Sequence, residues 1–88
     1  MIKRQLEIIN KTGLHARPAS EFVLLAKKFE SKVTIAKEGG EAVNAKSMVR
    51  LLAESIGQGC KVDLVVDGAD EEQAMEELAK LIESGFGE

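Results

Sequence analysis

Alternation of apolar and polar residues marks the strands of this chain. Residues 2–8, 33–35 and 60–67 alternate between apolar and polar side chains, which is the period of a half-buried strand. A short further strand is expected at residues 42–44, because the preceding Gly39-Gly40 pair is typical of a hairpin turn. The pattern therefore predicts four strands, each with a polar side that faces water.

Apolar residues three and four positions apart mark the helices. Residues 16–29 carry one apolar stripe. Proline is tolerated only in the first turn of a helix and disfavours a helical conformation at the residue before it, so Pro18 places the start of this helix between residues 16 and 18. Ser47 is a suitable N-cap for a short helix over residues 48–55. Asp70 and Gln73 resemble a capping box that opens the last helix. The predicted core face of that helix consists of Met75, Leu78, Ala79 and Ile82.

The predicted element order is β-α-β-β-α-β-α, with no internal repeat or linker. Strands with one polar face, interspersed with helices, fit one antiparallel sheet that is covered on a single side. We therefore predict an α+β fold, an open-faced β-sandwich with a four-stranded antiparallel sheet covered on one face by three helices. A chain of 88 residues is long enough for one modest core, so residues 1–88 are expected to form a single domain.

The composition is that of a globular protein and restricts the partners that are expected. No segment resembles a signal peptide or a membrane-spanning helix, so we expect a cytoplasmic protein without membrane insertion. The absence of Trp and Tyr and the net charge of −3 disfavour nucleic acid as a partner. Cys60 is the only cysteine, which excludes an intrachain disulfide, and we expect this side chain to be buried.

The charges are distributed unevenly along the chain. Residues 1–50 contain ten basic and five acidic residues, whereas residues 51–88 contain two basic and ten acidic residues. One interpretation is a solvated surface with no further role. The alternative is a basic face on the first half, which would steer acidic partners toward that side of the molecule.

The only histidine, His15, lies where a strand pattern gives way to a helix pattern. The start of a helix presents unpaired N–H groups and the positive end of the helix dipole, so it suits an anion. A neutral imidazole is a good nucleophile near neutral pH, and Arg17 could bind phosphate oxygens with its forked guanidinium. These residues suggest a histidine that is itself phosphorylated. The alternative is that His15 is a surface residue or a helix cap and takes part in no reaction.

Other kinds of site find little support in the sequence. A single histidine and a single cysteine do not supply the ligands of a zinc site. The glycine-rich motifs that bind nucleotides are absent. We therefore predict that the protein uses no metal and no cofactor.

Three segments of the chain resemble the histidine-containing phosphocarrier protein (HPr) family of the bacterial phosphoenolpyruvate-dependent phosphotransferase system. Leu14-His15-Ala16-Arg17-Pro18-Ala19 looks like the active-site signature of that family. Asn44-Ala45-Lys46-Ser47-Met48 looks like its regulatory serine segment, and residues 68–74 resemble the start of its last helix. The resemblance covers essentially the whole chain in the same order of elements.

The resemblance implies a role for several of these residues. Enzyme I, charged by phosphoenolpyruvate, would phosphorylate His15, and the phosphoryl group would pass to an enzyme IIA-type protein. Arg17 would stabilise this group, and Ser47 would be phosphorylated by a serine kinase/phosphorylase. The resemblance implies that Met48, Val49 and Leu52 dock partners. The uneven charge distribution, and not the resemblance, adds Lys28 and Arg50 as docking residues that supply positive charge. The protein would be a monomer, and a substrate of enzymes more than an enzyme with its own small-molecule pocket.

Several alternatives remain beside this interpretation. Ser47 could be only a helix cap, and Met48, Val49 and Leu52 could be ordinary core residues, although Leu51 is the one expected to point inward. Within the family, the chain could be a paralogue of the nitrogen-related branch with a mainly regulatory role. Outside it, the chain could be a small α+β interaction module without chemistry.

Overall fold

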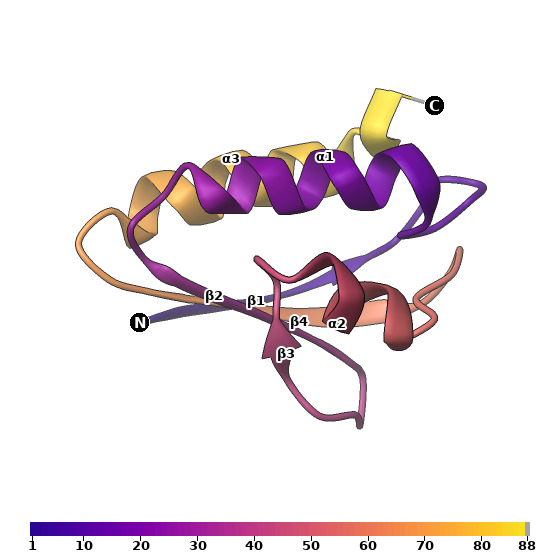
Figure 1. Ribbon diagram of the computed structural model, residues 1–88, viewed down its shortest axis with the longest axis horizontal. Helices are drawn as coiled ribbons and strands as arrows, with labels where there is room; N and C mark the ends of the chain where they lie inside the picture. Colours follow the sequence, from indigo (N-terminus) through magenta and orange to yellow (C-terminus); the bar gives the residue numbers. More distant parts are fainter. Residues whose placement is uncertain (88) are drawn as a thin grey trace.

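The strands and helices follow one another in the predicted order (Figure 1). The computed structural model describes residues 1–87 and ends in a single 3₁₀ turn, η1. The bounds are β1 Ile2–Glu7, α1 Ala16–Lys27, β2 Lys32–Lys37, β3 Val43–Asn44, α2 Met48–Ala53, β4 Lys61–Asp67, α3 Glu71–Glu83 and η1 Gly85–Gly87.

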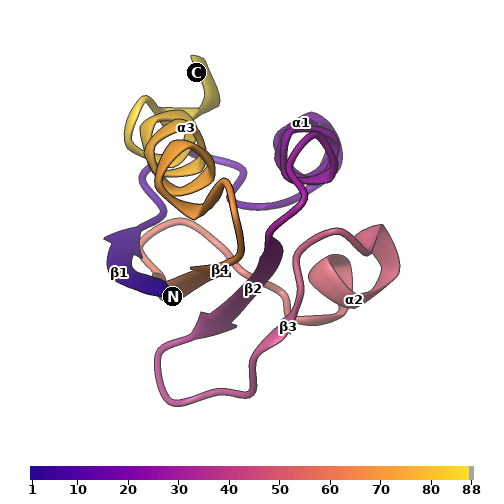
Figure 2. The same ribbon diagram turned by 90° about the vertical axis from the view of Figure 1, so that its left-hand side faces the viewer.

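The four strands form one antiparallel sheet in the order β1-β4-β2-β3. Figure 2 shows α1 and α3 side by side over one face of this sheet, with α2 beside β3. Along β4 the side chains of Val62, Leu64 and Val66 are buried, whereas Asp63 and Val65 between them are half-buried on the other face. The predicted open-faced β-sandwich is therefore confirmed.

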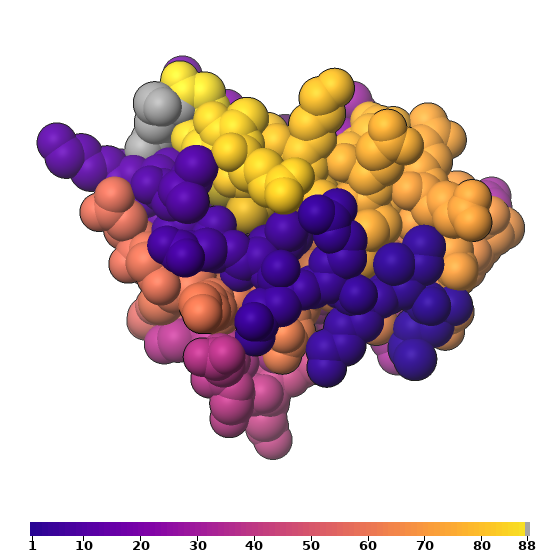
Figure 3. Space-filling model, turned by 180° about the vertical axis from the view of Figure 1, so that it is seen from behind, coloured from indigo at the N-terminus to yellow at the C-terminus, as the bar shows by residue number. Residues whose placement is uncertain are grey.

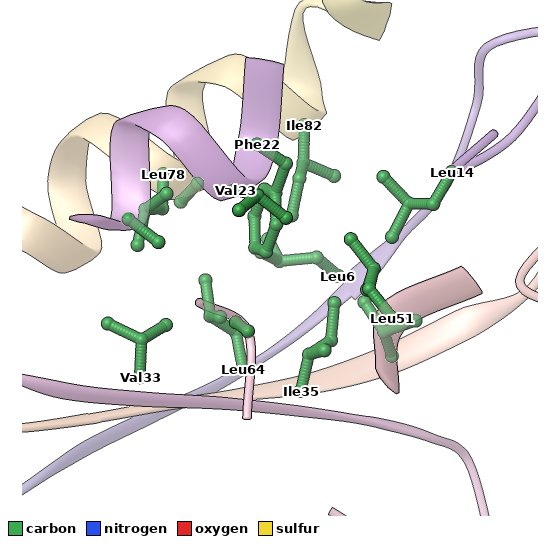
Figure 4. Packing of buried hydrophobic residues seen from close by; sticks show 14 of the residues in the cluster. Leu6, Leu14, Phe22, Val23, Val33, Ile35, Leu51, Leu64, Leu78 and Ile82 are labelled. Atoms are coloured by element: carbon green, nitrogen blue, oxygen red, sulfur yellow. The ribbon is translucent and has the colours of Figure 1, made fainter. Parts of the chain in front are cut away.

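The core lies between the sheet and the helices (Figure 4). Leu64 of β4 faces Phe22 of α1 and Leu78 of α3, and all three side chains are fully buried. Leu51 of α2 is also fully buried, so the prediction that this residue points inward is confirmed. The short α2 is thus held to the core through one face, which leaves its other side chains on the surface.

The element boundaries agree with the predicted ones to within a few residues. Helix α1 begins at Ala16, inside the predicted interval. Helix α2 ends at Ala53, earlier than expected, and Ser55 then adopts a left-handed conformation with φ of +51°. Cys60 precedes β4 and packs against the core while remaining partly exposed, so the expectation of a buried thiol is only partly correct.

The predicted capping box at the start of α3 is wrong. The Asp70 carboxylate accepts hydrogen bonds from the backbone N–H groups of Glu30 and Ser31, at 2.9 Å each, and from the Ser31 hydroxyl. The Gln73 amide donates to Glu77 instead of reaching back to the helix start. Asp70 therefore connects α3 to the turn between α1 and β2. The Ser31 hydroxyl, followed by the Glu30 N–H, lowers the pKa of this carboxyl below its ordinary value of 3.8.

The C-terminal turn lies against the segment that follows β1. Seen from behind, η1 and this segment are neighbours on the surface (Figure 3). A Cβ atom built on Gly85 would lie 3.6 Å from Cγ1 of Ile9 and 3.9 Å from Cβ of Asn10. The loop that leads to His15 therefore rests on the end of α3.

Candidate functional site

His15 is the exposed N-cap residue of α1. Its backbone is extended, with φ of −132° and ψ of 160°, and its imidazole makes no hydrogen bond to the helix. The next residue, Ala16, has φ of +51°, so the chain turns sharply between the loop and the helix. His15 is exposed, and no hydrogen bond or ion pair engages its imidazole within residues 1–87.

The start of α1 is suited to a negatively charged group. No side chain caps it, and its first turn contains no acidic residue. The N–H groups of a first helical turn lack partners within the helix, and the helix dipole adds positive potential there. A phosphoryl group on the adjacent His15 would lie in this favourable field.

Arg17 lies in the first turn of α1 and is strongly exposed. Its Nε lies 3.3 Å from Oε1 of Glu21, one turn further along the helix. The Arg17 side chain is 78% exposed, whereas that of Glu21 is 39% exposed, so water reaches both groups. An exposed pair of this kind is weak, and Arg17 can therefore exchange its partner.

Backbone contacts fix the loop that carries His15. The N–H of Leu14 donates to the carbonyl oxygen of Ile56 at 2.8 Å. Gly13 has φ of +69°, and a Cβ atom built on it would lie 2.6 Å from both the Ile56 oxygen and the Gly57 Cα atom. Only glycine fits so close an approach. The loop before His15 is thus packed against the chain that follows α2.

Helix α2 runs alongside α1 in the opposite direction. Near its start, Nζ of Lys46 donates to the carbonyl oxygen of Phe29, just beyond α1, at 2.7 Å. Beyond its end, Ile56 accepts from Leu14, just before α1. The α2 residues of later number therefore lie nearer to His15. Ser47 lies at the end that is closer to Phe29.

Most of the predicted docking residues are on the surface of α2. Val49 is 78% exposed and Leu52 is 38% exposed, so two large apolar side chains of α2 face the solvent. Arg50 is exposed beside them, whereas Met48 is half-buried and packs against the core. The alternative that these residues are ordinary core therefore fails for Val49 and Leu52 and is partly correct for Met48.

The structure separates Lys28 from His15. Lys28 is the C-cap residue of α1, and the rise of an α-helix places it roughly 18 Å from Ala16. It is exposed on the same end of the molecule as Lys46. Lys28 can contribute to the general basic field of this surface but does not lie beside His15.

Ser47 is the N-cap of α2, as predicted. Its Oγ accepts a hydrogen bond from the backbone N–H of Arg50 at 3.3 Å. Its side chain is half-buried, so the hydroxyl has both a structural role and access to solvent.

Two features near the site were missed by the sequence analysis. Leu24 of α1 is 60% exposed, and its position outside the apolar stripe of α1 could have indicated a surface role. Asn10 is 4% exposed and bonds to the loop before His15. Its turn-forming sequence predicts a loop, but no local pattern predicts that its side chain is buried.

Among residues 1–87, no group of three or more His, Cys, Asp and Glu side chains is arranged to hold a metal ion. No helix in the same part of the chain has both the length and the hydropathy needed to span a bilayer.

Known proteins share this sequence and this arrangement. Residues 2–84 match the family model described as the PTS HPr component phosphorylation site. The phosphocarrier protein HPr of Neisseria meningitidis is 43% identical over 88 residues, which are 100% of this chain and 98% of that protein. The chain belongs to the HPr family. This is the phosphocarrier family of the phosphotransferase system, a system of sugar transport.

HPr relatives also share the three-dimensional structure. The crystal structure of an HPr from Thermoanaerobacter tengcongensis has a TM-score of 0.96 and 48% identity, covering 100% of this chain and 98% of that one. The family includes the HPr-like protein Crh as well. Crh of Halalkalibacterium halodurans is 46% identical over 83 residues, which are 94% of this chain and 98% of that protein. Both kinds of HPr-family protein are therefore comparably similar to this chain.

Some solved HPr-family structures are dimers. One is an HPr dimer from Thermoanaerobacter tengcongensis, with 48% identity, a TM-score of 0.79 and full coverage of both chains. Crh of Bacillus subtilis forms a dimer with a swapped domain, and it has 40% identity, a TM-score of 0.74 and 97% coverage of both chains.

Proposed function

We propose that this protein carries phosphoryl groups on His15 between phosphorylated enzyme I and enzyme IIA-type proteins. The observation that supports this most directly is the exposed imidazole at the uncapped N-terminus of α1, in a chain of the HPr family. The same position resembles the phosphorylated histidine of the family signature. No small-molecule substrate is needed, because the protein is itself the substrate of its partners.

The reaction is a transfer between two imidazoles. The lone pair of Nδ1 of neutral His15 forms a new N–P bond, while the N–P bond of the donor phosphohistidine breaks. The electron pair of the broken bond stays on the donor nitrogen, so neither water nor a redox partner is consumed. Catalysis then depends on in-line positioning and on stabilising the charge of the phosphoryl oxygens.

Two features of α1 would stabilise the phosphoryl group. The first-turn N–H groups carry partial positive charge and already lie next to His15. Arg17 would exchange Glu21 for the phosphoryl oxygens, since a doubly charged group attracts a guanidinium more strongly than one carboxylate does.

Partners would dock on the surface formed by α2 and the start of α1. Met48, Val49 and Leu52 supply apolar area, and Arg50 supplies positive charge at the edge. Lys28, at the far end of α1, would act only through the long-range attraction of acidic partners. Such an interface suits transient binding, because a carrier has to leave one partner before it meets the next.

Incubation with enzyme I and phosphoenolpyruvate tests the proposal directly. We expect one acid-labile, base-stable phosphate per chain in the wild type and none in His15→Ala. Addition of an enzyme IIA-type protein should then remove the label. A wild-type protein that gains no phosphate under these conditions would exclude the carrier function and leave the interaction module as the remaining interpretation.

We also propose that phosphorylation of Ser47 regulates docking, as the resemblance implies. Crh of Bacillus subtilis, a catabolite repression protein, is 40% identical to this chain, and this similarity favours a regulatory role. The nitrogen-related branch is the alternative within the family. Ser47→Asp should keep the thermal stability, because aspartate is an equally good N-cap. It should slow phosphorylation of His15 by enzyme I, because its charge must be desolvated beside the apolar α2 side chains. An unchanged rate in Ser47→Asp would show that the serine is only a cap.

We propose further that the protein acts as a cytoplasmic monomer. Within one chain, β1 completes the sheet by pairing with β4 over its whole length. Light scattering coupled to gel filtration at micromolar concentration should give the mass of a single chain. A dimer under these conditions would overturn this proposal and place the chain with its dimeric relatives.

A further inference from the structure

Asn10 and Ser31 are the buried polar side chains of residues 1–87, and they lie near opposite ends of α1. The burial of the Ser31 hydroxyl is explained by its hydrogen bond to the Asp70 carboxylate, which also accepts from the Ser31 N–H. Asn10 is 4% exposed and lies in the loop before His15. Because burying an amide is costly unless it is bonded, its retention calls for a separate explanation.

The Asn10 side chain closes the turn that leads to the reactive histidine. Its Nδ2 donates to the Gly13 carbonyl oxygen at 2.9 Å and to Oγ1 of Thr12 at 3.3 Å. The backbone carbonyl oxygen of Asn10 accepts from the Gly13 N–H at 3.1 Å. Asn10 therefore ties both polar backbone atoms of Gly13, two residues before His15.

The turn closed by Asn10 packs against the segment that follows α2 on one side and against η1 on the other. Gly13 is in close contact with the backbone of Ile56 and Gly57. The side chain of Gln58 donates to the carbonyl oxygen of Ile9 at 3.2 Å, and η1 packs behind the turn. A loop supported in this way transmits the position of Gly13 to the next two residues.

His15 has no other means of being positioned. Its imidazole makes no hydrogen bond within residues 1–87, so the place of the side chain depends on where the backbone on either side holds its Cα and Cβ atoms. On one side Ala16 is held by α1, and on the other Leu14 and Gly13 are held by Ile56 and Asn10.

The Asn10 side chain is not optimised for stability alone. Its Oδ1 is buried and has no hydrogen-bond partner within residues 1–87. An unpaired buried acceptor costs part of what the two Nδ2 bonds contribute. Replacing Asn10 by alanine removes the unpaired Oδ1 together with both Nδ2 bonds, and it leaves the Gly13 carbonyl oxygen without its side-chain donor.

We infer that Asn10 is a positioning residue for phosphoryl transfer, holding the backbone that aims His15 at a docked donor. This inference rests on the proposed carrier function. It requires that loss of Asn10 lowers the turnover of phosphorylation and not the affinity for enzyme I, since the α2 surface is unchanged.

The test compares Asn10→Ala with Ser31→Ala. Both variants replace a buried polar side chain by a methyl group, one near each end of α1. With enzyme I and phosphoenolpyruvate, kcat for Asn10→Ala should fall about tenfold, because small misplacements of reacting atoms have large effects on rate. Its KM should stay within twofold of the wild type. Ser31→Ala should keep both constants while lowering the melting temperature.

Two further measurements separate positioning from other effects. Amide hydrogen exchange should become faster at Gly13 and Leu14 in Asn10→Ala and stay unchanged there in Ser31→Ala. Phosphoramidate, a small donor that needs no docking, should phosphorylate His15 of Asn10→Ala at the wild-type rate.

The outcomes distinguish this inference from the proposed function. If the wild-type protein accepts no phosphate from enzyme I, both the proposed carrier function and the positioning role of Asn10 are excluded. An active wild type with an unchanged kcat in Asn10→Ala, or with a raised KM alone, overturns the role of Asn10 only. Equal slowing with phosphoramidate would also overturn it, because the imidazole itself would then be altered.

Discussion

The two ends of α1 are held in place in different ways. At its C-terminal end, side chains secure the turn to β2: Lys46 binds the Phe29 carbonyl, and Asp70 binds Ser31 and the Glu30 N–H. At its N-terminal end, His15 and Arg17 are exposed, and the imidazole has no partner within residues 1–87. There the order comes from the backbone of the preceding loop.

This difference separates stability from reactivity. The loop before His15 has a buried side chain, Asn10, that bonds to Gly13, while the proposed phosphoryl acceptor makes no side-chain hydrogen bond within residues 1–87. At the other end, charged side chains are used for stabilisation. Substitutions at the two ends should accordingly affect different measurements.

The largest effect on activity is expected for His15→Ala. This variant should accept no acid-labile phosphate from enzyme I. Its folding should be nearly intact, because a side chain at a helix boundary that makes no cap bond contributes at most about 1 kcal/mol. Radiolabelling and thermal unfolding of the same preparation measure both quantities. Phosphate on another residue, or a large drop in stability, would remove the contrast between the two ends.

Arg17→Ala should slow the reaction without abolishing it. One charge-assisted contact to a phosphoryl oxygen contributes about 1.5–3 kcal/mol, which corresponds to roughly ten- to 150-fold in rate. The thermal stability should hardly change, because the pair with Glu21 is exposed. Rapid-quench kinetics with enzyme I measure the rate. A rate equal to that of the wild type would show that Arg17 is only a surface cation.

The sequence predicts the fold well because its signals are local. The alternation of apolar and polar residues in β4 fits only a half-buried strand, and the apolar stripe of α1 fits only an amphipathic helix. Leu51 is buried, as predicted. The proline limits the helix start to residues 16–18, and the helix begins at Ala16, within that interval.

The errors arise where a contact joins distant parts of the chain. Asp70 has the spacing of a capping box, but its carboxylate bonds to Ser31, which lies 39 residues away. The pairing of Lys46 with Phe29 and the burial of Asn10 also depend on packing between elements. Local spacing singles out His15 as the proposed phosphoryl acceptor but not the residues that hold its loop.

Asp70→Asn should affect stability with a defined dependence on pH. The native-state pKa of Asp70 lies below 3.8, so its carboxylate stabilises the fold above that pH, and this contribution is lost as the pH falls through the native pKa. The variant should therefore be less stable than the wild type at pH 7, and the difference should narrow below about pH 4. Urea unfolding at pH 7, 5, 4 and 3 checks this.

Phosphorylation of His15 in Asp70→Asn should proceed at the wild-type rate at pH 7, since Asp70 acts at the other end of α1. A stability difference that stays constant from pH 7 to pH 3 would show that the charge of Asp70 is not what holds the turn.

The smallest effect is expected for Glu21→Gln, which frees Arg17 from its partner. Exposed pairs of this kind contribute about 0.2–1 kcal/mol, so phosphorylation of His15 should become faster by at most roughly fivefold. Glu76→Gln is the matched control, because it removes the same charge from an exposed position on α3. In an Arg17→Ala background, Glu21→Gln should have no effect. An acceleration that persists without Arg17, or that Glu76→Gln reproduces, would mean that Glu21 only lowers the attraction of acidic partners.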